Sequence, residues 1–186
     1  MQCPKDRKTT LMDGTLMGQL PVLCCPDCQG AWLPPQSYGE WQEHQPSVDD
    51  PSELIDRVLE TDATPSPTDG IASLCPACKC YLARVKVSTK TPFYLERCPN
   101  CKGIWCDRGE WEVLEKTGLH RIIDRLFSTE WQALVREREL FAQERRATIE
   151  KLGPELAARI FELAEVLAQH PNGDFGVAYL MRRFDQ

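Results

Sequence analysis

Four cysteines in two closely spaced pairs are the residues of this chain best suited to chemistry. They are Cys75 and Cys78, followed by Cys98 and Cys101. Two residues between the cysteines of a pair let the chain turn tightly, so that both sulfurs face one ion, and two such turns complete a tetrahedron. Thiolates are soft ligands that Zn²⁺ favours, and four of them leave no position for a substrate. The spacing therefore predicts a structural zinc site.

The N-terminal segment repeats this pattern with one change. Cys3 corresponds to the first cysteine of the pattern, and Cys25 and Cys28 correspond to its second pair. The remaining position holds Asp6, where the second copy has Cys78. The sequence therefore contains an internal duplication whose first copy has a different ligand set.

Three interpretations of the first copy remain open. Asp6 could complete a site with the three thiols, since carboxylates do bind zinc. Cys24 could supply the fourth ligand instead, although neighbouring residues of a strand point to opposite sides. The first copy could also hold no metal and keep its fold by packing. Cys80 and Cys106 align with Lys8 and Leu33 of the first copy, so they are counted as thiols outside both sites.

Short hairpins and helices must position these cysteines. In the second copy, residues 81–87 and 93–97 are predicted to be strands on either side of a turn. In the first copy, residues 9–12 and 22–23 have the same role, with a turn signal at Asp13-Gly14. Each turn that carries a pair of candidate ligands is called a knuckle. Trp32 and Trp105 follow the second knuckle of each copy and are expected to pack over the sites. Asp107 and Glu110 form a capping-box pattern for a short helix that should stop at Gly118.

The rest of the chain is predicted to be mainly helical. Residues 121–127 are expected to form a short helix, and residues 128–152 and 155–169 two longer helices separated by Gly153-Pro154. Their facing apolar stripes predict a helical hairpin. Residues 175–184 carry enough apolar side chains to dock as a final helix or strand.

Charge is unevenly spread along the chain, whose net charge is −6. Counting Lys and Arg against Asp and Glu, residues 37–73 carry −8 and residues 74–106 carry +5. The acidic stretch favours a flexible linker with one short helix near residues 53–59. The basic stretch offers candidate nucleic-acid contacts, but a solvated hairpin edge is favoured because no aromatic residues are interleaved with the charges for base stacking. These candidates are Arg84, Lys86, Lys90, Arg97 and Lys102.

One stretch resembles a known family. The motif Cys75-x-x-Cys78 followed by Cys98-Pro99-x-Cys101-x-Gly103-x-Trp105-x-Asp107-Arg108-Gly109-Glu110 is similar to the transcription factor IIB-type zinc ribbon of small prokaryotic proteins. The resemblance covers residues 74–116, with a degenerate copy at 1–44, and leaves the helical region uncovered. It implies a zinc-ribbon fold with zinc held by the four matching cysteines, and it implies little about activity.

Together these features predict an α+β protein made of two tandem zinc-ribbon hairpin domains and a helical hairpin region. The expected parts are a degenerate ribbon at 1–44, an acidic linker with a short helix at 45–73, a zinc ribbon with a trailing helix at 74–118, and a helical region at 119–186. One zinc ion is expected in the second ribbon, and a second is possible in the first.

The predicted function is that of a non-catalytic interaction or adaptor protein with a link to transcription. Its helical tail would contact a protein partner or a second copy. A closed thiolate site cannot activate water, and the histidines His44, His120 and His170 are scattered and expected at the surface. Nucleic-acid binding by the basic ribbon is one alternative, and thiol redox chemistry at Cys24, Cys80 or Cys106 is another. No apolar run or signal segment is evident, so we expect a cytoplasmic protein with no membrane contact and no small-molecule substrate.

Overall fold

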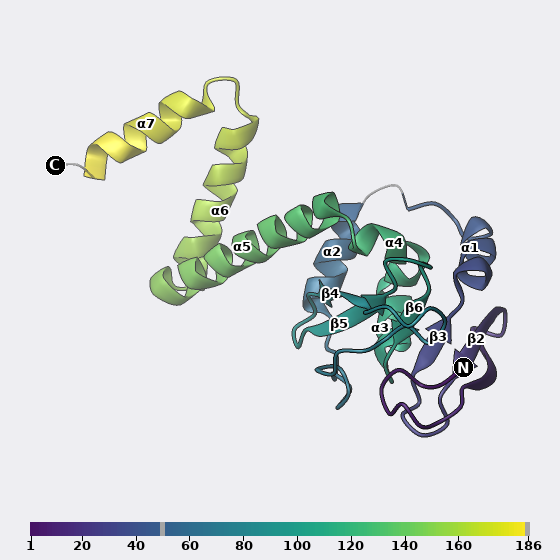
Figure 1. The fold of residues 1–186 in the computed structure, drawn as a ribbon. Coiled ribbons are helices and arrows are strands. Elements are labelled where there is room, and N and C mark those ends of the chain that lie inside the picture. Colours follow the sequence, from purple (N-terminus) through teal and green to yellow (C-terminus); the bar gives the residue numbers. More distant parts are fainter. Residues whose placement is uncertain (49–50, 185–186) are drawn as a thin grey trace. The chain divides into compact units, whose positions relative to one another are not determined.

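The computed structural model describes residues 1–48 and 51–184, so residues 49–50 of the expected linker and 185–186 of the expected helical region lie outside the described residues. The chain divides into two compact units, Met1–Arg136 and Glu137–Gln186. The first unit contains both ribbons, and the second consists of helices (Figure 1). The α+β class expected from the sequence is therefore confirmed.

A six-stranded antiparallel sheet is the frame of the first unit. Its order is β1-β2-β3-β6-β5-β4. The strands are β1 (Met12–Leu16), β2 (Leu20–Cys24), β3 (Ala31–Leu33), β4 (Ala83–Val87), β5 (Phe93–Arg97) and β6 (Ile104–Cys106). Each ribbon thus supplies three strands, and the two sets meet in the middle of the sheet.

The two ribbons are joined by their shortest strands. Strand β3 pairs with β6 so that Trp32 lies opposite Trp105 and Leu33 lies opposite Ile104. The sequence predicted separate ribbon domains on a tether, whereas the structure shows one continuous sheet. The pairing leaves β1 and β4 at the edges of that sheet.

Helices cover the main apolar core of the first unit. They are α1 (Pro35–Glu43), α2 (Pro51–Glu60), α3 (Glu110–Thr117), the 3₁₀ helix η1 (Leu119–Arg121), α4 (Ile123–Leu126) and the start of α5 (Thr129–Leu152). The helix expected within the linker forms as α2, and its Leu54, Ile55 and Val58 are buried in this core. Burying these side chains anchors that part of the connector, because each removes apolar surface from water.

The boundary expected near residue 118 differs in the structure. Ile123, Leu126 and Trp131 are buried with the sheet residues, so the chain up to Arg136 belongs to the first unit. Helix α3 ends as expected at Gly118, which has a φ of 86°. It begins after Gly109 rather than after the expected cap Asp107, but the N–H of Asp107 donates to Glu110 Oε2 at 2.8 Å, as the capping-box pattern predicts.

The second unit contains the C-terminal part of α5, then α6 (Pro154–Gln169) and α7 (Gly173–Phe184). The expected helical hairpin lies one helix later in the chain, between α6 and α7. A Cβ atom built on Gly173 would lie 1.8 Å from the Leu167 carbonyl oxygen, and one on Gly176 would lie 2.6 Å from Leu167 Cδ2. Glycine at both positions is what lets the two helices approach this closely. Among the described residues, no helix is both long enough and apolar enough to cross a membrane.

Candidate metal centre

All four cysteine knuckles share one backbone turn. The fourth residue after the first cysteine of each knuckle has a left-handed backbone with φ between 60° and 66°, and its N–H donates to the carbonyl oxygen of that cysteine at 3.0 Å. These residues are Arg7, Gln29, Lys79 and Lys102. None of them is glycine, so residue type did not indicate a left-handed backbone at these positions. Their constant spacing after the first cysteine of each knuckle is the signal that could have identified the turn.

The second ribbon brings its four predicted ligands together. The sulfur atoms of Cys75, Cys78, Cys98 and Cys101 all lie within 4.8 Å of one another. Cys75 Sγ lies 3.6 Å from Cys101 Sγ, and Cys78 Sγ lies 3.3 Å from Cys98 Sγ. Sulfurs bound to one zinc ion at about 2.3 Å would be about 3.8 Å apart at the vertices of a tetrahedron. The four thiols therefore fit a zinc ion with little rearrangement.

Cys80 was expected outside the site, and the structure places it at the edge of the site. Its sulfur lies 3.3 Å from Cys78 Sγ and 3.2 Å from Cys98 Sγ. Comparison with the first copy was misleading here, because the corresponding residue there, Lys8, has no thiol.

The first ribbon brings together three thiols and places Asp6 beside them. Cys3, Cys25 and Cys28 have sulfurs within 4.8 Å of one another. The Asp6 Oδ2 atom lies 3.5 Å from Cys25 Sγ, while Oδ1 accepts the N–H groups of Lys8 and Thr9. Burial acts to raise the pKa of Asp6, but these two hydrogen bonds outweigh it and hold the pKa at about 2. A carboxylate charged at neutral pH therefore lies beside Cys25, but only the three thiols lie within 4.8 Å of one another.

The other two thiols lie away from the zinc sites. Cys24 packs against the helix-covered core, and a Cβ atom on Gly14 would lie 2.7 Å from its sulfur. Cys106 is buried in the same core, and burial raises its pKa well above the usual value. Neighbouring residues of the strand lie on opposite sides, as expected: Cys25 lies in the thiol cluster and Cys24 lies against the core. A buried, protonated Cys106 is a poor candidate for redox chemistry.

Tryptophans and glycines of the two ribbons interlock beside the thiols. A Cβ atom on Gly30 would lie 2.3 Å from Trp105 Cζ2, and one on Gly103 would lie 2.1 Å from Trp32 Cζ2. Each tryptophan thus covers the glycine of the other ribbon. Both indole rings belong to a buried cluster with the cysteines, which confirms packing over the sites as their role.

A buried lysine links the first knuckle to the second ribbon. Lys5 Nζ lies 2.9 Å from Glu96 Oε2 and 3.3 Å from Asp107 Oδ2, and these side chains are almost completely buried. It also donates to the carbonyl oxygens of Thr68 and Ile71 in the connector. Breaking such a buried pair by removing one partner is costly, because the other charge is left uncompensated. Sequence reasoning missed this link, since a lysine next to a cysteine knuckle resembles any exposed lysine.

Glu110 is the basis of a pH prediction. Burial, and then the carboxylate of Asp107, raise the pKa of Glu110 to about 9; Asp69 adds to this and Lys5 opposes it. The unfolded chain releases this proton near pH 4.3, so the contribution of Glu110 to stability is present below about pH 4 and is lost as the pH rises towards the folded-state pKa. We expect Glu110→Gln to raise the Tm more at about pH 8 than at about pH 5. Thermal unfolding across this range checks it.

The matched control is Glu112→Gln, at an exposed position of the same helix, where no such difference is expected. Equal pH dependence in wild type and Glu110→Gln would contradict the protonated state of Glu110.

The expected nucleic-acid contacts are mostly engaged with acidic side chains. The ion pairs are Arg84–Asp69, Lys90–Asp62 and Arg97–Asp124. Arg84 and Arg97 also lie over the rings of Tyr94 and Phe127. Charges already paired in this way give a weak footprint for a phosphate backbone.

One of the three histidines differs from expectation. His120 is buried between Trp41 and Trp111, and burial lowers its pKa. Its Nδ1 atom lies 3.2 Å from the carbonyl oxygen of Leu114. The ring therefore fills a core position in the first unit.

Comparison with known proteins supports the second ribbon. Residues 74–116 match the family model described as transcription factor zinc-finger. No curated protein and no solved structure matches the chain. With the thiol geometry, the match identifies the Cys75, Cys78, Cys98 and Cys101 cluster as a zinc site, and the Cys3, Cys25 and Cys28 cluster fits a possible second ion.

Proposed function

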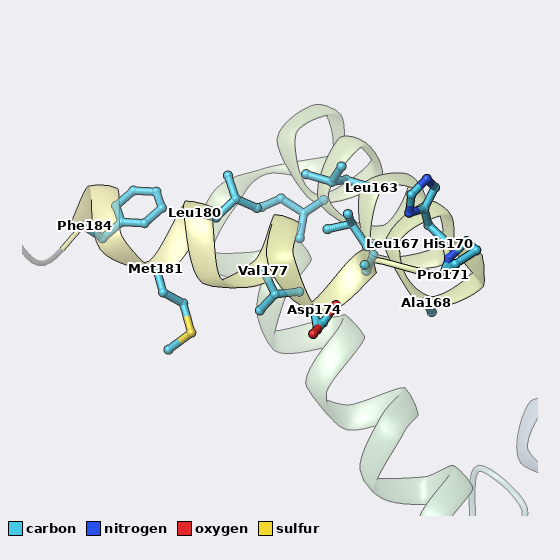
Figure 2. Close-up of a pocket in the computed structure, with 13 residues that line it drawn as sticks. Leu163, Leu167, Ala168, His170, Pro171, Asp174, Val177, Leu180, Met181 and Phe184 are labelled. Atoms are coloured by element: carbon cyan, nitrogen blue, oxygen red, sulfur yellow. The ribbon is translucent and has the colours of Figure 1, made fainter.

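We propose that this protein is a non-catalytic interaction protein in which zinc holds a double ribbon and the C-terminal helices bind a second copy of the chain. The observation that carries the proposal is an apolar groove between α6 and α7. The groove has a volume of about 730 Å³. Leu163, Leu167 and Leu180 gather where the two helices meet (Figure 2).

The groove leaves large apolar side chains in water. Leu163 is 44% exposed, Met181 is 64% exposed and Phe184 is 85% exposed. Asp174 is the one acidic residue among the groove residues, and His170 lies at the turn between the helices. Exposed apolar patches of this kind, with few charges, are typical of sites where proteins associate.

Charge balance favours a second copy as the occupant. Residues 137–184 carry a net charge of −1, counted over Lys, Arg, Asp and Glu. Two such units can meet without strong electrostatic repulsion, because like charges brought together would otherwise oppose the contact. A two-fold arrangement would place one hairpin against the same surface of another, which gives a four-helix bundle.

Leu163→Asp is expected to abolish this self-association. A carboxylate placed among apolar groove residues would have to be buried without a partner, which costs several kcal/mol or more. Sedimentation of the full chain measures the mass of the assembly. We expect the wild type to be dimeric and Leu163→Asp to be monomeric.

Val166→Asp is the matched control. Val166 lies on the same helix and is 59% exposed, but it does not line the groove. It should leave the dimer intact. A monomeric wild type, or equal effects of the two substitutions, would contradict the proposal; a monomer that retains a protein partner through the groove would point to a heterologous adaptor.

The zinc ribbon suggests the process in which this assembly acts. The family description of residues 74–116 supports a role near transcription, where a paired ribbon could present two copies of one surface. A closed set of four thiolates supports a structural rather than catalytic use of the zinc.

A further inference from the structure

The second zinc site has more thiols than a zinc ion needs. A structural zinc ion takes four ligands. The site has five thiols in or beside it, because Cys80 lies next to the edge formed by Cys78 and Cys98. Cys80 Sγ is 3.2 Å from Cys98 Sγ, which is even closer than Cys78 Sγ at 3.3 Å. Cys80 is not one of the four sulfurs that lie within 4.8 Å of one another, so its side chain has to move to take the position of Cys78.

We propose that Cys80 is a reserve ligand that replaces Cys78 at the zinc ion. In the exchanged site, the ion is held by Cys75, Cys80, Cys98 and Cys101. The number of thiolates stays at four, so the charge and the closed shell of the site are unchanged. The inference depends on the zinc site alone and is independent of self-association.

The two thiols differ in exposure in the way that exchange requires. Cys75 and Cys98 are buried, Cys101 and Cys80 are half-buried, and Cys78 is exposed. Cys78 is therefore the most exposed residue among the four predicted ligands. Its replacement lies only two residues along the chain.

The backbone already holds Cys80 next to the thiol cluster. The N–H of Cys75 donates to the carbonyl oxygen of Cys80 at 2.8 Å, and the N–H of Lys79 donates to the carbonyl oxygen of Cys75 at 3.0 Å. These bonds tie residues 79 and 80 to the buried ligand Cys75. Movement of the Cys80 side chain can therefore bring its sulfur onto the ion while these backbone bonds stay in place.

The test uses serine variants of the full chain. We measure zinc per chain and, after replacement by Co²⁺, the intensity of the thiolate-to-metal absorption. Cys75→Ser defines the zinc content when the second site is lost, because Cys75 has no nearby substitute. Cys78→Ser and Cys80→Ser are expected to match the wild type in both measurements, whereas the double variant is expected to fall to the Cys75→Ser level.

Several results would overturn the proposal. If Cys78→Ser loses as much zinc as Cys75→Ser, Cys80 does not act as a ligand. If the double variant keeps its zinc, three thiols are sufficient and no reserve is needed. If Cys80→Ser alone loses zinc, Cys80 is an obligatory ligand rather than a substitute. If wild type and Cys75→Ser hold equal zinc, the five thiols hold none.

Discussion

Replacing Cys98 by serine is expected to remove zinc from the second ribbon and to unfold the unit Met1–Arg136. Structural zinc binding contributes about 10–16 kcal/mol to the folding of small zinc domains. A typical domain is stable by only about 5–15 kcal/mol, so losing this contribution is enough to unfold it. Because β6 pairs with β3, the loss should extend to the first ribbon.

Zinc content, circular dichroism and tryptophan fluorescence measure this effect together. Cys24→Ser is the matched control, because it makes the same chemical change at a thiol outside the zinc sites. The control should keep its zinc and its fold. Retained zinc in Cys98→Ser would contradict the ligand assignment, and a folded first ribbon after zinc loss would contradict the coupling through the sheet.

Gly103→Ala is expected to destabilise the joined ribbons while leaving the zinc ligands unchanged. The added methyl group would lie 2.1 Å from Trp32 Cζ2, so the indole ring would have to move. Trp32 is 1% exposed and packs against the thiol cluster, so it has little space to do so. Overpacking of this kind costs about 1–3 kcal/mol, and sometimes more. Urea unfolding monitored by tryptophan fluorescence gives the free energy of unfolding.

Gly39→Ala provides the comparison for this substitution. Gly39 lies in α1, and a Cβ atom built there has nothing within 4 Å. Alanine in place of an unhindered helical glycine is expected to stabilise by about 0.4–1 kcal/mol. A similar loss of stability in both variants would show that the contact with Trp32 is not the cause.

The local features of the fold could be predicted from the sequence. Cysteine spacing identified the thiols that come together in each ribbon, and Gly118 identified the end of α3. The long helices followed from apolar periodicity and from the break at Gly153-Pro154, because these signals depend on neighbouring residues.

Contacts between distant segments could not be predicted. Strands β3 and β6 have only three residues each, so they give no alternation that could suggest a partner strand. The burial of Lys5 depends on Glu96 and Asp107, which lie about ninety or more residues along the chain and come close only in the folded sheet. The position of Cys80 depends on the same three-dimensional context.

The packing of α6 against α7 could not be predicted from the sequence of either helix alone. Apolar stripes on α5, α6 and α7 are compatible with several pairings, and the choice depends on how closely two backbones can approach. Gly173 and Gly176 make the approach to Leu167 possible, which favours α7 as the neighbour of α6.

Each ribbon places its tryptophan over the glycine of the other ribbon, so the first unit resembles a dimer of two ribbons that belong to one chain. Because the connector tethers the two halves, each meets the other at a high effective concentration, and their association costs far less entropy than that of separate molecules. The half with Asp6 in place of a cysteine can therefore remain folded on the half whose four thiols are intact. Because of this support, the first ribbon needs less stabilisation from metal binding. A ligand set that binds zinc too weakly to fold an isolated ribbon is then sufficient in the joined pair.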